Sequence, residues 1–103
     1  MVIGKRIMTY KYEFPDFDYD MPNLGNGWVD SSWHNDTCPS FEFTTNQGIV
    51  YRLWVEYANP DIREIGGKQF TLSKYFDYDD LTPLFESDNL NEVLEHFNNL
   101  IKV

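Results

Sequence analysis

The stretch IVYRLWVEY, residues 49–57, constrains the fold of this chain more than any other part of the sequence. Arg52 and Glu56 point to one side of an extended backbone, because successive residues of a strand face opposite ways. The other side then carries only large, mostly apolar side chains: Ile49, Tyr51, Leu53, Val55 and Tyr57. This period of two predicts a β-strand with one buried face. The remaining chain must supply neighbouring strands and a layer that covers that face.

Shorter alternating stretches supply candidates for the neighbouring strands. We predict strands over Lys5–Phe14, over Trp28–Trp33 and around Phe41 and Phe43, which flank Glu42. Further along, Gly66-Gly67 is typical of a hairpin turn between strands at Ile62–Ile65 and Lys68–Leu72. A short helix that starts at Asn59 and Pro60 and stops at Gly66 is the alternative for this segment.

The carboxy-terminal segment has the pattern of an amphipathic helix. Asn89 lies three residues ahead of Glu92, which is the spacing of a capping box. Apolar residues then recur at helical spacing on one stripe: Leu90, Val93, Leu94, Phe97, Leu100 and Ile101. We therefore predict one α+β domain over residues 1–103, an antiparallel sheet of about four to five strands with this helix packed on one face.

The charge of the chain is strongly negative and unevenly distributed. The net charge is −9, and neither residues 12–51 nor residues 75–101 contain a Lys or Arg. Such a field opposes binding to phosphates and to anionic lipid and favours a basic partner. A solvated acidic surface that promotes solubility would explain the same composition. No apolar run is long enough to cross a bilayer and Cys38 is the single cysteine, so we expect a cytoplasmic protein without membrane association.

The tetrapeptide FDYD occurs twice, once in each acidic region. In extended backbone the aspartates of such a repeat form a row on one side, at a spacing of about 6.6 Å, while the aromatic residues face the core. A nucleic-acid strand carries one charge per about 3.4 Å, which is a similar scale. We therefore predict partner-binding contacts at both copies: Asp16, Asp18, Tyr19, Asp20, Asp77, Tyr78, Asp79 and Asp80. Alternatively, the aromatic residues only fill the core and the aspartates lie in a turn-prone loop.

Two other residue patterns suggest different chemistry. Asp16, Asp18 and Asp20 match the first ligand positions of a calcium-binding EF-hand, but Met21 and Gly27 occupy positions that need glycine and glutamate, so we expect no metal site there. The loop with His34, Asp36 and Cys38 has the residue types of a thiol nucleophile with its base or of a metal site. It lacks further cysteine ligands and an evident oxyanion hole, and a purely structural loop is the simpler interpretation.

Three stretches in the middle of the chain carry a resemblance to other proteins. WHNDTCPSF (33–41), LWVEYANPDIRE (53–64) and GKQFTL (67–72) look like segments of short proteins carried by phages and other mobile elements. In its acidic, compact, single-domain character the chain is also similar to anti-CRISPR proteins and DNA-mimic inhibitors. The resemblance implies no catalytic residues and no cofactor.

The sequence thus leads to two hypotheses. The first is a non-enzymatic acidic protein that inhibits a host defence or nucleic-acid-processing protein by occupying its basic nucleic-acid-binding surface, without binding nucleic acid itself. The second is a small enzyme or metal-binding protein centred on His34, Asp36 and Cys38. A structure distinguishes them, because the second hypothesis requires those three side chains to face one pocket.

Overall fold

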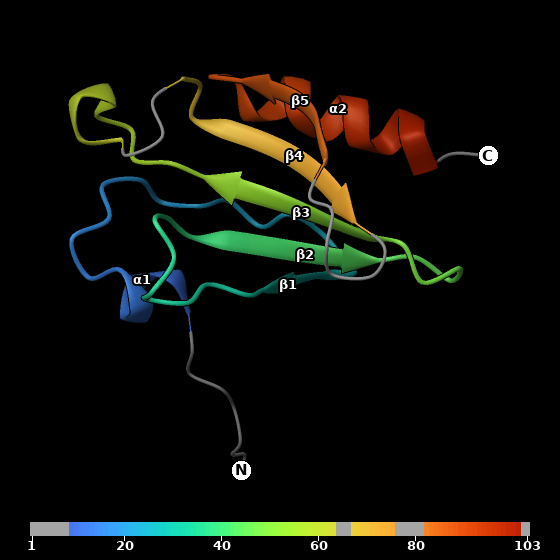
Figure 1. Ribbon diagram of the computed structural model, residues 1–103, viewed down its shortest axis with the longest axis horizontal. Helices are drawn as coiled ribbons and strands as arrows, with labels where there is room; N and C mark the ends of the chain where they lie inside the picture. The colour runs from blue at the N-terminus through green and yellow to red at the C-terminus, as the bar shows by residue number, and fades with distance from the viewer. Residues whose placement is uncertain (1–8, 64–66, 76–81, 102–103) are drawn as a thin grey trace, which may run out of the picture.

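The predicted α+β fold is confirmed by the computed structural model, which describes residues 9–63, 67–75 and 82–101. Five antiparallel strands pair in chain order, each with the next, and α2 lies against one face of the sheet (Figure 1). A four-residue helix and a 3-10 turn complete the described part. The elements are α1 Tyr10–Glu13, β1 Trp28–Asp30, β2 Ser40–Thr44, β3 Val50–Val55, η1 Pro60–Ile62, β4 Phe70–Tyr75, β5 Thr82–Ser87 and α2 Leu90–Ile101.

Strand register separates the sheet into a covered face and an open face. Leu53 pairs with Phe41 on β2 and with Leu72 on β4, and this buried row forms the core beneath α2. The adjacent residues point the opposite way, toward the face that α2 leaves open. Two cross-strand rows result on the open face: Val29, Glu42, Arg52, Ser73 and Pro83, and next to it Ser40, Trp54, Thr71 and Glu86.

Helix α2 begins at Leu90 and is capped, as the sequence predicts, by Asn89, whose side-chain oxygen accepts a hydrogen bond from the backbone N–H of Asn91 at 2.9 Å. The capping box contains one additional residue. The Ser87 hydroxyl accepts from the Asn89 N–H at 2.9 Å and donates to the Glu92 carboxylate at 2.7 Å. Ser87 thus bridges the two groups that a capping box joins directly. Leu90, Val93 and Phe97 are the buried residues of α2, and they belong to the core between the helix and the sheet.

The prediction of a strand over Lys5–Phe14 is wrong for the residues that the structure describes, because residues 10–13 form α1. Residues 5–8 lie outside the described part. Thr9 caps this turn: its hydroxyl oxygen accepts from the Tyr12 N–H at 3.3 Å, and its backbone oxygen accepts from the Glu13 N–H at 2.9 Å. The Asp30 carboxylate accepts from the Tyr10 N–H at 2.7 Å. The alternating pattern therefore does not decide the structure here, because a distant aspartate accepts the hydrogen bond from the first N–H group of a helical turn.

The segment after β3 agrees better with the alternative prediction, a short helix that starts at Asn59 and Pro60, than with the predicted hairpin. Asn59 caps the 3-10 turn η1 by accepting from the Asp61 N–H at 3.0 Å, and Pro60 is its first residue. Residues 64–66 lie outside the described part of the chain. The next strand is β4, which continues to Tyr75, beyond the predicted end at Leu72. Strand β5 was not predicted from the sequence, since Pro83 interrupts its pattern; proline is tolerated there because β5 is an edge strand.

Candidate functional site: an acidic segment and an open-face pocket

The first acidic segment, Asp16–Asp20, presents its carboxylates to solvent. Asp16, Asp18 and Asp20 are all exposed, whereas the two aromatic residues between them are partly buried and pack against the core. The Phe17 ring lies 5.0 Å from that of Tyr57, and the Tyr19 ring lies 5.6 Å from that of Phe70, both edge-on. The alternation expected from the sequence is therefore present in this copy. Tyr19 is a half-buried packing residue, so little of its ring is available to a partner.

Each aspartate of this segment also has a contact within the chain. Asp18 accepts hydrogen bonds from the backbone N–H groups of Ala58 and Asn59, at 2.7 and 2.9 Å. Asp16 accepts from the Tyr57 hydroxyl at 3.4 Å, and Asp20 pairs with the Lys11 ammonium group at 2.9 Å. Asp18 thus fixes the acidic segment to the turn after β3. The charge of Asp20 is offset by Lys11, while those of Asp16 and Asp18 are not balanced by a cation among these contacts.

The second FDYD copy lies outside the described residues. Asp77, Tyr78, Asp79 and Asp80 all fall in the segment 76–81. The expectation that both acidic segments form one face therefore stays a prediction.

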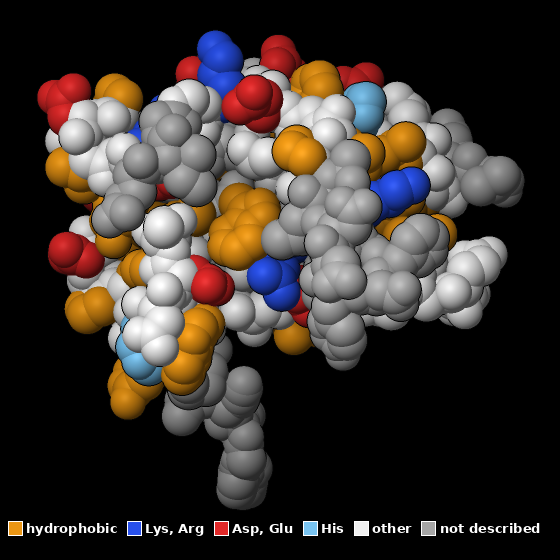
Figure 2. All heavy atoms as spheres, in the orientation of Figure 1, with side chains coloured by type: hydrophobic (Ala, Val, Ile, Leu, Met, Phe, Trp, Pro, Cys, Tyr) orange, Lys and Arg blue, Asp and Glu red, His pale blue; other side chains and the backbone are white. Residues whose placement is uncertain are grey.

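Cations in the described residues are largely engaged with acids of the same chain. Arg63 and Lys68 both contact the Asp88 carboxylate, at 3.3 and 3.8 Å, and Arg52 pairs with Glu42. The backbone N–H of Gln69, together with Arg63 and Lys68, lowers the pKa of Asp88, which is therefore ionised at neutral pH. Figure 2 shows the open face, where acidic side chains are spread around a hydrophobic centre. The acidic character of this face is thus dispersed, and it surrounds an apolar area.

The structure does not bring His34, Asp36 and Cys38 to one pocket. The His34 ring nitrogen Nδ1 lies 2.8 Å from the Glu13 carboxylate, which also accepts from the His34 backbone N–H at 2.9 Å. Asp36 and Cys38 instead line a pocket on the open face, and His34 is absent from the described residues that line it. Within the described ranges, no group of three or more His, Cys, Asp or Glu side chains is arranged to hold a metal ion. The arrangement gives the enzyme and metal hypothesis no support.

Cys38 is buried, with 1% of its surface exposed, and burial raises the pKa of its thiol to about 12, with a further contribution from the nearby Glu56 carboxylate. A thiol with this pKa stays protonated at neutral pH and is a poor nucleophile. The folded-state pKa lies above the unfolded value of about 8.5. Cys38 therefore stabilises the fold fully below that unfolded value, and this contribution declines as pH rises toward the folded pKa.

We expect the free energy of unfolding of the wild type to fall by roughly 1–3 kcal/mol more than that of a Cys38→Ala variant between about pH 8 and about pH 10.5. Urea titrations of both proteins at the two pH values measure this difference. Tyr57 titrates in both proteins, and most of the increase in its pKa comes from burial, Asp16 and Asp18, which both proteins share; Cys38 is the smallest cause and is lost in the variant, so the Tyr57 contribution cancels only in large part. Parallel pH dependence of the two proteins would show that the thiol is not held neutral by its surroundings.

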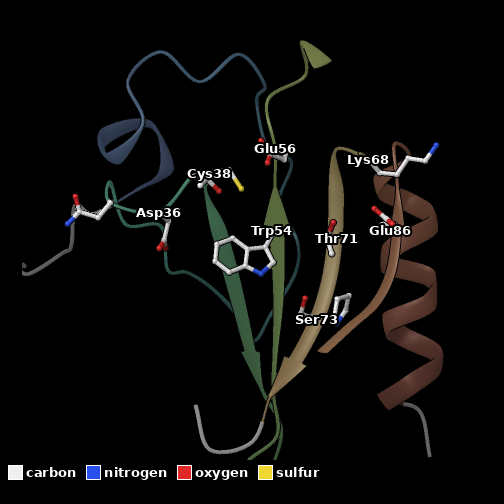
Figure 3. Close-up of a pocket in the computed structure, with 11 residues that line it drawn as sticks. Asp36, Cys38, Trp54, Glu56, Lys68, Thr71, Ser73 and Glu86 are labelled. Carbon is white, nitrogen blue, oxygen red and sulfur yellow. The ribbon is translucent and has the colours of Figure 1, made fainter. Parts of the chain in front are cut away.

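The pocket beside Cys38 has a volume of about 520 Å³ and lies on the open face of the sheet (Figure 3). The Trp54 ring lies over β2 and β3 at its centre, with Glu56 and Cys38 at one end. Asp36 and Glu86 come from opposite sides of the pocket, and Thr71 and Ser73 on β4 line it between them. This pocket was not predicted from the sequence. Its one signal was Trp54, a large aromatic residue at a position that shares the polar face with Arg52 and Glu56.

No family model, no curated protein and no solved structure matches this chain. The resemblance to proteins of phages and mobile elements therefore stays a prediction. In the part of the chain that the structure describes, α2 and the other helices are too short or too polar to cross a membrane.

Proposed function

We propose that this protein is a non-enzymatic binding protein that occupies a basic, nucleic-acid-binding surface on a partner protein. The observation that carries the proposal is the geometry of Asp16–Asp20. Three exposed carboxylates lie on a segment whose backbone is held in place by core packing of Phe17 and Tyr19 and by the two hydrogen bonds to Asp18. Because this segment is already ordered, binding through it costs little conformational entropy.

The mechanism is electrostatic and steric competition. Lysine and arginine side chains that normally hold phosphate pair instead with the carboxylates, while the body of the domain covers the surface that nucleic acid would occupy. With a net charge of −9, the protein itself repels nucleic acid. Inhibition of a host protein by a product of a phage or mobile element is the biological setting that we propose. The lone Cys38 fits a reducing cytoplasm.

Capture from a lysate of the cells in which the protein acts tests this function. The immobilised protein is incubated with the lysate at low salt, and bound proteins are then eluted either with high salt or with duplex DNA. We expect the eluted proteins to be nucleic-acid-binding proteins, and we expect both eluents to release them, because both compete for the same positive charges. A partner that neither eluent releases would contradict the proposal.

The role of the acidic segment is tested by the double variant Asp16→Asn with Asp20→Asn. Asp18 is left unchanged because its carboxylate holds the turn after β3. We expect the association rate with the captured partner to fall roughly threefold or more at low salt, and to change little at high salt, because the lost charges act by steering.

The matched control is Glu92→Gln with Glu95→Gln on α2, which removes the same total charge from exposed positions of another element. A glutamine side chain at position 92 keeps an acceptor for the Ser87 hydroxyl. We expect a smaller decrease in the association rate for the control. Equal decreases in the two double variants would mean that net charge matters and the Asp16–Asp20 segment does not.

A further inference from the structure

The pocket over Trp54 combines an aromatic wall with an excess of negative charge. Of the described residues that line it, Asp36, Glu56 and Glu86 are acidic and Lys68 is basic. The Lys68 ammonium group lies 3.8 Å from the carboxylate of Asp88, which does not line the pocket. The raised pKa of Cys38, caused in part by Glu56, is consistent with a negative potential at the pocket wall. Such a lining is complementary to a cation that also has a flat or apolar body.

The chain already binds a guanidinium group at this indole. The Arg52 guanidinium carbon lies 5.0 Å from the centre of the Trp54 ring, and the same guanidinium group pairs with the Glu42 carboxylate. The Trp54 indole and the Glu42 carboxylate thus both contact the same guanidinium group. Arginine suits this arrangement because its planar group stacks on an aromatic ring while its N–H groups reach a carboxylate.

The same combination occurs on the other side of Trp54. Arg52 and Glu56 are two residues before and two residues after Trp54, so on this face they flank the indole from opposite directions along β3. The pocket extends from Glu56 at one end to Ser73 and Pro83 at the other, and Arg52 is not among the described residues that line it. Asp36 and Glu86 supply further carboxylates around the same volume. An indole with nearby carboxylates is therefore presented toward an open pocket.

We propose that the pocket over Trp54 binds an arginine side chain of the partner protein. This inference rests on the proposed function and specifies it further: the exposed aspartates attract a basic surface, and the pocket takes one arginine from it as an anchor. Buried arginine anchors beside aromatic residues are typical of the energetically dominant contacts in protein interfaces. The remaining acidic side chains contribute steering and little affinity of their own.

Titration with a short peptide tests the site without the partner. The probe is acetyl-Gly-Arg-Gly-amide, and the matched control peptide carries citrulline, which has the shape of arginine without its charge. The readout is the indole N–H signal of Trp54 in ¹H–¹⁵N spectra, assigned by its loss in a Trp54→Phe variant. We expect saturable shifts of this signal with the arginine peptide, at a Kd of the order of millimolar, and binding that is weaker by about threefold or more for the citrulline peptide.

A pair of variants separates the pocket from general charge. Glu86→Gln removes a carboxylate from the pocket, while Glu95→Gln removes one from an exposed position on α2. We expect Glu86→Gln to weaken the arginine peptide about two- to fivefold and Glu95→Gln to leave it nearly unchanged. If the Trp54 signal does not move, or moves equally with both peptides, the proposed site is wrong.

The two proposals fail separately. Partner binding that persists unchanged in the Glu86→Gln and Trp54→Phe variants would reject the arginine site and leave the proposed function standing. A pocket that binds the arginine peptide, in a protein that captures no nucleic-acid-binding partner, would support the site and reject the function.

Discussion

Replacing Phe97 by alanine is expected to lower the free energy of unfolding by about 3–5 kcal/mol. Phe97 is only 2% exposed, and its ring contacts those of Trp28, Phe43 and Tyr51 at centroid distances of 4.8, 5.0 and 5.3 Å. The substitution removes the main connection between α2 and strands β1–β3. A domain of this size has a total stability of about 5–15 kcal/mol, so the variant would be close to unfolding at moderate temperature.

Thermal and urea unfolding followed by circular dichroism measure the effect of Phe97→Ala. The matched control is Leu100→Ala, an apolar truncation on the same helix at a position that is 41% exposed, for which we expect a loss of less than about 1 kcal/mol. Similar losses in the two variants would mean that α2 is not docked through Phe97.

Replacing Gly27 by alanine is expected to lower the free energy of unfolding by about 2–4 kcal/mol. Gly27 has φ of 95°, which is unfavourable for any residue with a Cβ atom, and a Cβ atom there would overlap the ring of Phe43. That ring cannot move aside easily, because Trp28 and Phe97 pack against it.

Gly48→Ala is the control for Gly27→Ala. Gly48 has φ of 89°, but nothing lies within 4 Å of the Cβ position. Its replacement should cost only the backbone term, about 1–2 kcal/mol. The difference between the two variants, measured by urea unfolding, isolates the contact with Phe43. Equal losses would mean that the Phe43 ring adjusts without cost.

Local sequence pattern predicts the parts of this fold whose stability is local or follows a strict period. The nine-residue alternation at 49–57 contains β3, and the Asn89 cap with its apolar stripe gives α2. The pattern fails at α1, since that turn depends on Asp30, twenty residues away. It also fails at β5, where Pro83 is acceptable only because the strand lies at the sheet edge.

In the candidate site, too, local features could be predicted from the sequence and features that depend on distant residues could not. Exposure of Asp16, Asp18 and Asp20 follows from alternation with Phe17 and Tyr19, and could be predicted. The attachment of Asp18 to the backbone of Ala58 and Asn59, some forty residues away, could not. Neutralising all three aspartates would relieve their mutual repulsion, but it would also remove an acceptor that holds a turn, so we expect the stability of the triple variant to fall.

Sequence spacing also misled the interpretation of His34, Asp36 and Cys38. Their proximity in the chain suggested one site, but His34 turns to Glu13, whose side chain is 1% exposed, while Asp36 and Cys38 face the pocket. The pocket itself is assembled from four regions of the chain by the pairing of β3, β4 and β5. No linear motif encodes such a site, although a tryptophan on the polar face of a strand is a signal to look for one.

Competition between this protein and nucleic acid for a captured partner tests whether the protein occupies a nucleic-acid-binding surface. Labelled duplex DNA is titrated with the partner, by fluorescence anisotropy, at several fixed concentrations of the protein. We expect the apparent Kd for DNA to rise linearly with the concentration of the protein, no ternary complex to form, and the competition to weaken as salt is added. An unchanged DNA affinity, or a stable complex of partner, DNA and this protein, would show that the protein does not occupy the DNA-binding surface.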